Sequence, residues 1–250
     1  MTAIETDYLG HDTVYQRIQA NNAIGWDPEE PSYQKMLAQV KSALPPFRPG
    51  QTPKLLEIGC GAGNLSILLA QLGYEVTGVD ISPTAVAWAN DREKPAGLMT
   101  AFRIDDVVKL ASCENQYFDV VIDGHCLHCI IGDDRELCLE SILRVLKPGG
   151  TMVVVTMCGE VLDPTNKARQ DASLNIVSNG VAVRHIGTQI SIAAEVRSTG
   201  FEIKSVTVEP RENEASQDDL IVVATARPAL NARTINPPEI QRLQSSSKGS

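Results

Sequence analysis

Apolar residues along this chain gather in short runs that alternate with stretches of helical spacing. The runs predict strands over 54–58, 75–80, 98–104, 118–123 and 151–157. The stretches between them predict helices over 64–72, 83–92 and 134–146. Strands that are apolar on both faces and alternate with helices are typical of a parallel sheet with helices on both sides. The pattern therefore predicts an α/β fold, a three-layer sandwich, for residues 51–227.

In the later part of the chain, the predicted strands and helices no longer alternate regularly. A helix is predicted over 188–198, and strands over 201–208 and 220–226 follow it. The polar link 209–219 has the character of a hairpin loop, which makes the last two strands antiparallel. Residues 158–187 have a weak pattern and are long for a connection within a domain, so we expect them to cover a substrate. From 228 to 250, prolines, serines and isolated charges predict a flexible tail.

Residues 1–50 are too few for a domain and are interpreted as a helical flap over the body. Val14, Tyr15 and Ile18 are spaced as on one face of a short helix. A second helix is predicted from Ser32, as its cap, to residue 44. Trp26 lies in the turn between these helices, where it could anchor the flap or form a wall of a substrate pocket.

The composition limits the partners that we expect. The chain has 250 residues, 43% of them hydrophobic, and a formal net charge of −9. Phosphate contacts need clustered Lys and Arg, so neither nucleic acid nor an anionic membrane surface is expected. No apolar stretch reaches the ~20 residues of a membrane span. Without a secretory signal after Met1 or disulfide-like spacing of the six cysteines, we expect reduced thiols and a cytoplasmic location.

A glycine-rich turn after the first body strand is the clearest candidate ligand site. Gly59, Gly61 and Gly63 stand at alternate positions, and the next helix starts at Asn64. Glycine permits positive φ and close backbone approach, so the N–H groups of the turn can face a ligand at the positive end of a helix. A dinucleotide-binding turn would have its third glycine where Asn64 stands. Glu57, an acid within the apolar strand, would gain nothing beside a pyrophosphate, so a nucleoside without phosphates is favoured.

Acidic residues follow the next three strands, where an open α/β sheet binds its ligand. Asp80 ends the second strand, 21 residues after Gly59, and its carboxylate can accept hydrogen bonds from both hydroxyls of a ribose. Asp105–Val107 follow the third strand, and an acid beside an apolar group can frame an adenine. Asp123–His125 end the fourth strand. A dinucleotide fold shares the acid at the second strand, so NAD(P) remains an alternative at this point.

With these residues the chain resembles the class I S-adenosylmethionine-dependent methyltransferases. The motifs that carry the resemblance are Leu56–Gly63, Val79–Ser82, Phe118–Val121 and Leu143–Gly150, within a similarity that covers 53–157. The resemblance implies a Rossmann-like, mostly parallel sheet of seven strands with an antiparallel last strand. It also implies an enzyme that moves a methyl group from S-adenosylmethionine to an O, N or S atom of a small molecule by in-line displacement.

The resemblance implies individual roles at a cofactor site. Asp80 would bind the ribose hydroxyls, Ile81 would pack on the adenine, and Asp106 would accept a hydrogen bond from the adenine amino group. Glu57 would organise the first loop, and Gly124 would line the methionine side. The full set of implied cofactor contacts is Glu57, Gly59, Cys60, Gly61, Gly63, Asn64, Asp80, Ile81, Ser82, Asp105, Asp106, Val107, Asp123 and Gly124.

The stretch 125–129 interleaves His-x-x-His with Cys-x-x-Cys, a spacing that metal and redox sites use. On a helix only one such pair points the same way, and no second ligand cluster follows, so we expect no metal. His125, nearest to the strand end, is the candidate acceptor contact or catalytic base. His128 is also placed at the acceptor side, with a packed and hydrogen-bonded histidine as the simpler interpretation. Arg184 could hold an acceptor carboxylate or phosphate, or belong to a solvated loop.

Methyl transfer from an activated donor does not require a catalytic side chain. Alignment and exclusion of water supply most of the effect, and a base is needed only where the acceptor must lose a proton. The acceptor is therefore left open beyond a small molecule, and the protein is expected to be a monomer or homodimer. Two other functions stay open, an NAD(P)-dependent oxidoreductase on a related fold and a non-catalytic nucleoside-binding module.

Overall fold

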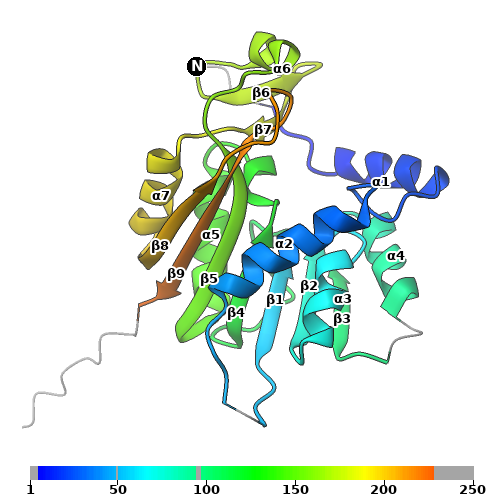
Figure 1. Cartoon of the computed structure of the whole chain (residues 1–250), viewed down its shortest axis with the longest axis vertical. Coiled ribbons are helices and arrows are strands. Elements are labelled where there is room, and N and C mark those ends of the chain that lie inside the picture. Colours follow the sequence, from blue (N-terminus) through cyan, green and yellow to red (C-terminus); the bar gives the residue numbers. More distant parts are fainter. Residues whose placement is uncertain (1–4, 49, 94–96, 228–250) are drawn as a thin grey trace, which may run out of the picture.

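The computed structural model of the chain describes residues 5–48, 50–93 and 97–227, which contain a seven-stranded sheet. The strands are β1 (Lys54–Ile58), β2 (Glu75–Asp80), β3 (Thr100–Ile104), β4 (Phe118–Gly124), β5 (Leu146–Cys158), β8 (Phe201–Glu209) and β9 (Asp218–Ala226). Their order across the sheet is β3-β2-β1-β4-β5-β9-β8 (Figure 1). The pairs from β3 to β5 are parallel, and β9 is antiparallel to both β5 and β8. The predicted fold class is confirmed, including the antiparallel last strand.

Helices cover both faces of this sheet (Figure 1). They are α1 (Gly10–Ala20), α2 (Glu30–Ala43), α3 (Asn64–Gln71), α4 (Pro83–Glu93), α5 (Asp134–Val145), α6 (Pro164–Arg169) and α7 (Gln189–Ser198), with a 3₁₀ helix η1 (Leu127–Cys129). Leu56 belongs to a core that includes Leu139 of α5, whereas its neighbour Leu55 packs with Val40 of α2 and Leu69 of α3. Successive residues of a strand face opposite sides, so β1 supplies both cores.

Several predicted boundaries differ from the structure, and two of the differences have a clear local reason. Helix α2 begins at Glu30, two residues before the predicted cap Ser32, with Pro31 in its first turn. Proline fits that position because its fixed φ is helical and the first turn has no use for its missing N–H. Strand β5 begins at Leu146 instead of Thr151, since Leu146 already pairs with Phe118 before the glycine-rich turn interrupts the register.

The weakly patterned segment 158–187 contains elements that the hydrophobic pattern did not predict. Helix α6 is followed by a hairpin of β6 (Asn175–Ser178) and β7 (Val181–His185). Between the two strands, Asn179 and Gly180 have φ values of 51° and 83°. Asn-Gly with two positive φ angles is the strongest local signal of a tight hairpin turn, and it could have revealed this hairpin.

The N-terminal residues are joined to this hairpin. Thr6 forms a parallel bridge with Ala182 of β7, and the Ala182 N–H donates to the Glu5 carbonyl at 3.0 Å. The division into a flap, a body and a covering segment stays a prediction, and the predicted tail 228–250 lies outside the described residues. In the ranges that the structure describes, no helix is long and apolar enough to cross a membrane.

Candidate functional site

A cavity of about 470 Å³ lies at the carboxyl ends of β1, β2 and β4, the edge that the sequence predicts for a ligand. Most of the predicted cofactor contacts line it, namely Glu57, Gly59, Cys60, Gly61, Asn64, Asp80, Ile81, Asp106, Val107 and Gly124. Gly63, Ser82, Asp105 and Asp123 are not among its lining residues. The four predicted acceptor contacts, Trp26, His125, His128 and Arg184, line the same cavity.

The glycine turn adopts the backbone conformation that its composition predicts. Gly59 and Gly61 have φ values of 62° and 53°, in the left-handed region. A Cβ at Gly61 would lie 2.4 Å from the Tyr15 hydroxyl, and one at Gly59 would lie 2.7 Å from the Cys126 sulfur. Both positions therefore need glycine for conformation and for space.

Asp80 binds this turn from the end of β2. Its Oδ2 accepts a hydrogen bond from the Gly61 N–H at 2.8 Å, and its Oδ1 accepts one from the Ser82 N–H at 2.9 Å. Burial raises the pKa of Asp80, and these two hydrogen bonds oppose that rise. Each carboxylate oxygen has a second lone pair, so Asp80 keeps acceptor capacity for a ligand in the cavity.

Two further acids at the site, Glu57 and Asp123, are almost fully buried. Burial raises the pKa of Glu57 to about 8, although the Ser66 hydroxyl donates a hydrogen bond to its carboxylate. Burial likewise raises the pKa of Asp123 to about 7. Asp123 accepts hydrogen bonds from the N–H groups of Cys126 and Leu127 at 2.5 and 2.9 Å, so it shapes the segment that leads into η1.

The acids after β3 have separate positions. The Asp105 carboxylate accepts hydrogen bonds from the Ser112 hydroxyl at 2.6 Å and the Ser112 N–H at 2.8 Å, so it folds its own loop. Asp106 lines the cavity next to Val107.

His125, the predicted acceptor contact, and Asp219 meet at the cavity. His125 has a left-handed φ of 70°, and its Nε2 lies 3.6 Å from Asp219 Oδ1. Burial lowers the pKa of His125, while the Asp219 charge opposes that shift. Sequence reasoning missed Asp219, because it lies at the start of a distant strand. Only the pairing of β9 with β5 brings it to this edge, opposite Met157.

His128 is buried, as predicted, but one of its two ring nitrogens is not hydrogen-bonded within the described ranges. Its Nδ1 has no hydrogen-bond partner among the residues that the structure describes, and the same holds for His125 Nδ1. The two rings meet edge to face, with centroids 5.6 Å apart. Burial lowers the pKa of His128 well below its usual value, and the charges of His125 and Arg184 lower it further. Both imidazoles are therefore neutral near pH 7.

The N-terminal segment contributes lining residues to the cavity, including some that the sequence did not single out. Trp26 contacts the rings of His11 and Tyr15, at centroid distances of 5.6 and 5.4 Å, while it also lines the cavity. Trp26 therefore packs within the N-terminal segment and also forms part of the cavity wall. The Ile24 carbonyl accepts hydrogen bonds from Asn64 Nδ2 at 3.1 Å and from the Arg92 guanidinium at 2.7 Å.

Comparisons with known proteins show which proteins the chain is similar to. A family model described as a methyltransferase domain matches residues 56–154. A ubiquinone biosynthesis O-methyltransferase of Xanthomonas euvesicatoria pv. vesicatoria (strain 85-10) is 27% identical over 175 residues, 65% of this chain and 69% of that protein. A protein of the same name from Chelativorans sp. (strain BNC1) is 31% identical over 110 residues, 44% of this chain and 42% of that protein.

The chain contains a methyltransferase domain, and its relatives and fold neighbours support a class I S-adenosylmethionine-dependent methyltransferase. Solved structures share the fold at low identity. The 1,6-didemethyltoxoflavin-N1-methyltransferase of Burkholderia thailandensis, bound to 1,6-didemethyltoxoflavin and S-adenosylhomocysteine, has a TM-score of 0.66 at 17% identity, with 91% of this chain and 93% of that chain covered. An S-adenosylmethionine-dependent methyltransferase from Methanosarcina mazei has a TM-score of 0.63 at 21% identity, with 76% and 97% covered.

This methyltransferase uses S-adenosylmethionine as its cofactor, and the family assignment decides against an NAD(P)-dependent oxidoreductase or a non-catalytic module. The residues present fit that cofactor. The glycines of the turn place no side chains of their own between its backbone and the cavity, so a ligand can approach the backbone closely, and the Asp80 carboxylate keeps lone pairs free to accept hydrogen bonds from it. In the described part of the chain, no group of three or more His, Cys, Asp or Glu side chains could hold a metal ion. All six cysteines are free thiols, and burial raises the pKa of Cys129 to about 11.

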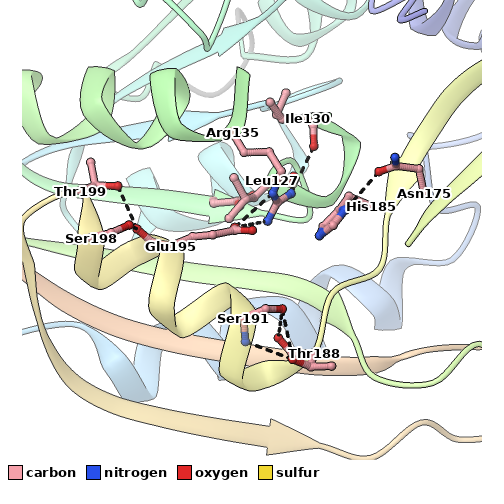
Figure 2. Close-up of polar contacts among 11 residues, drawn as sticks. Leu127, Ile130, Arg135, Asn175, His185, Thr188, Ser191, Glu195, Ser198 and Thr199 are labelled. Carbon is pink, nitrogen blue, oxygen red and sulfur yellow. Dashed lines mark hydrogen bonds and ion pairs between the residues drawn. The ribbon is translucent and has the colours of Figure 1, made fainter. Parts of the chain in front are cut away.

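A buried arginine, Arg135, holds the segment around η1 that lines the cavity (Figure 2). Arg135 of α5 donates to the carbonyls of Leu127 and Ile130 at 2.7 and 3.2 Å, and to Glu195 of α7 at 2.7 Å (Figure 2). These bonds connect η1, which carries His128, to two helices of the body. Arg135 has no sequence signal of its own, because an arginine in a mixed helix is normally a solvated residue.

Proposed function

We propose that this methyltransferase methylates a hydroxyl oxygen of a small molecule, in preference to a nitrogen or sulfur atom. The observation that carries the proposal is one shared cavity, which is lined both by the predicted cofactor residues around Gly61 and Asp80 and by His125 and Asp219. Cavities of about 300–1,000 Å³ hold small molecules, and this one falls in that range. The relatives named as O-methyltransferases support oxygen as the accepting atom.

The proposed division of labour follows from the geometry. When bound, S-adenosylmethionine supplies an activated methyl group; its transfer leaves S-adenosylhomocysteine, and the acceptor oxygen exchanges its proton for the methyl group. The glycine turn and Asp80 orient the nucleoside, as the sequence implies. The flap with Trp26 excludes water over the cavity, and aligned reactants of this kind gain about 7–11 kcal/mol.

His125 is the proposed proton acceptor. Its Nε2 lies 3.6 Å from Asp219, too far for a hydrogen bond but close enough for an ion pair. The lowered pKa keeps the ring neutral near pH 7, so it can take the hydroxyl proton. The Asp219 carboxylate then stabilises the imidazolium. General bases of this kind contribute about 10²–10⁴-fold to the rate.

A screen with labelled S-adenosylmethionine and small hydroxyl compounds tests the proposal, together with His125→Asn. We expect the variant to lose at least a hundredfold in kcat while its S-adenosylhomocysteine affinity is unchanged. Because the pKa of His125 is lowered from 6.5, the wild-type rate should be constant near pH 7 and fall as the pH drops below about 6.5.

Asp80→Ala is the matched control for the cofactor half of the site. It should weaken S-adenosylhomocysteine binding at least tenfold, about 1.4 kcal/mol. A His125→Asn enzyme with kcat within threefold of wild type would exclude the base. A screen in which only amines or thiols are methylated would overturn the oxygen acceptor.

A further inference from the structure

A cation that lines the cavity, Arg184, has no counterion among the residues that the structure describes. Arg184 of β7 lines the cavity and is half-buried. Within the described ranges it makes no hydrogen bond and no ion pair, whereas three other cations have acidic partners. Lys35 pairs with Glu212 at 3.3 Å, Arg135 with Glu195 at 2.7 Å, and Arg211 with Asp218 at 3.0 Å.

Arg184 is held inward by its position on the strand. Its partner across the hairpin is Ile176 of β6, which is 5% exposed, and the pairing shifts register at Val183. Directly opposed residues share a face of a sheet, so Arg184 lies on the face of the hairpin that carries buried Ile176. Arginine seldom lies on an inward face unless its charge is paired, because removing it from water is unfavourable.

The side chains around Arg184 are also incompletely paired. Its positive charge lowers the pKa of both His125 and His128, which places it within electrostatic reach of both rings. The Nδ1 atoms of these two imidazoles are buried and have no hydrogen-bond partner among the described residues. Buried polar groups are normally paired, so two buried Nδ1 atoms without partners, in a cavity that an unpaired guanidinium also lines, indicate that a polar ligand completes this part of the site.

We propose that the methyl acceptor is a small hydroxy acid whose carboxylate pairs with Arg184 and whose hydroxyl group meets His125. The guanidinium presents a planar fork of donors that matches a carboxylate with two parallel hydrogen bonds. The acid is anchored next to the histidine pair, and its hydroxyl is thereby directed to the proposed base. This inference rests on the proposed function and adds the chemical class of the substrate to it.

Paired acids and amides test the inference by calorimetric titration in saturating S-adenosylhomocysteine. The probes are salicylate, 4-hydroxybenzoate and lactate, each compared with its neutral amide. We expect at least one acid to bind wild-type protein tenfold or more tightly than its amide. Arg184→Gln should abolish that preference, and Arg184→Lys should retain part of it because the charge remains.

Arg169→Gln is the matched control, because Arg169 is an exposed arginine of the same segment that does not line the cavity. It should leave the preference for the acid unchanged. The inference is overturned if no acid binds more tightly than its amide, or if the preference survives in Arg184→Gln. Methylation of a neutral hydroxyl compound without preference for acids would leave the proposed function intact, whereas failure to bind S-adenosylhomocysteine would remove both.

Discussion

Asp12 of α1 fastens the N-terminal segment to the cofactor end of the site. Its Oδ1 accepts a hydrogen bond from the Ser82 hydroxyl at 2.6 Å and one from the Thr84 N–H at 2.9 Å. Asp12 thus caps the start of α4 from another helix and holds Tyr15, one turn later, against Gly61. We call the two hydrogen bonds from Ser82 and Thr84 to Asp12 the clasp. We predict that Asp12→Ala weakens cofactor binding because it removes both of these hydrogen bonds.

The size of the effect can be worked from these contacts. Removal of a helix cap costs about 0.5–2 kcal/mol, and hydrogen bonds to a charged group contribute about 1.5–3 kcal/mol each. Asp12 is only partly buried, so solvent screening reduces the sum, and about 1–2 kcal/mol remains. That free energy corresponds to a five- to thirtyfold change in an equilibrium constant.

Titration calorimetry and stopped-flow dissociation of S-adenosylhomocysteine measure the effect. Asp12→Ala should bind at least fivefold more weakly, mainly through faster dissociation, because the covering helix opens more often. Gln16→Ala is the matched control, since it removes only the 2.7 Å contact to the other Asp12 oxygen, and it should bind normally. Unchanged affinity and dissociation in Asp12→Ala, even with a lower Tm, would refute the clasp.

Two further predictions concern buried charges. Burial raises the pKa of Glu57 from 4.5 to about 8, so the folded protein holds a proton that the unfolded chain releases, and stability should fall as pH rises from about 4.5 to 8. Urea unfolding at pH 5.5 and 8.5 measures this fall in stability, and Glu57→Gln should remove the part that Glu57 causes. The same pH dependence of stability in the wild type and in Glu57→Gln would contradict the prediction. Arg135→Ala leaves Glu195 and two carbonyls unpaired and should cost about 3 kcal/mol. Glu195→Gln should cost less in the same assay, because Arg135 keeps both carbonyl bonds, and equal losses would argue against the network.

The parallel part of the fold could be predicted because its signals are local. β1 and β2 have the predicted bounds, since both are short apolar runs that end in glycine or in an acid at the ligand edge. The β6–β7 hairpin was missed because its few apolar residues, such as Ile176, pack in a small core of their own with Val161 and Ile186. Such a cluster is too short to produce a periodic pattern.

The predicted cofactor residues could be placed from the sequence more fully than the residues at the proposed acceptor end. Gly59, Gly61 and Asp80 could be placed from their positions alone, because a parallel sheet brings the carboxyl ends of its strands to one edge. The sequence favours Asp106 over Asp105 at the adenine, and of these two acids only Asp106 lines the cavity, because hydrogen bonds within one loop consume the Asp105 carboxylate.

The acceptor end depends on contacts between distant segments. Asp219 reaches His125 only because β9 runs antiparallel to β5, and Asp12 reaches Ser82 only because α1 folds back over α4. Arg184 joins them through a hairpin with no counterpart in the hydrophobic pattern. Periodicity reports the burial of each element but not which polar side chains meet across elements. The residues that are predicted to bind the cofactor can therefore be identified from the sequence. The residues that are proposed to select the acceptor are brought together only by the packing of separate segments.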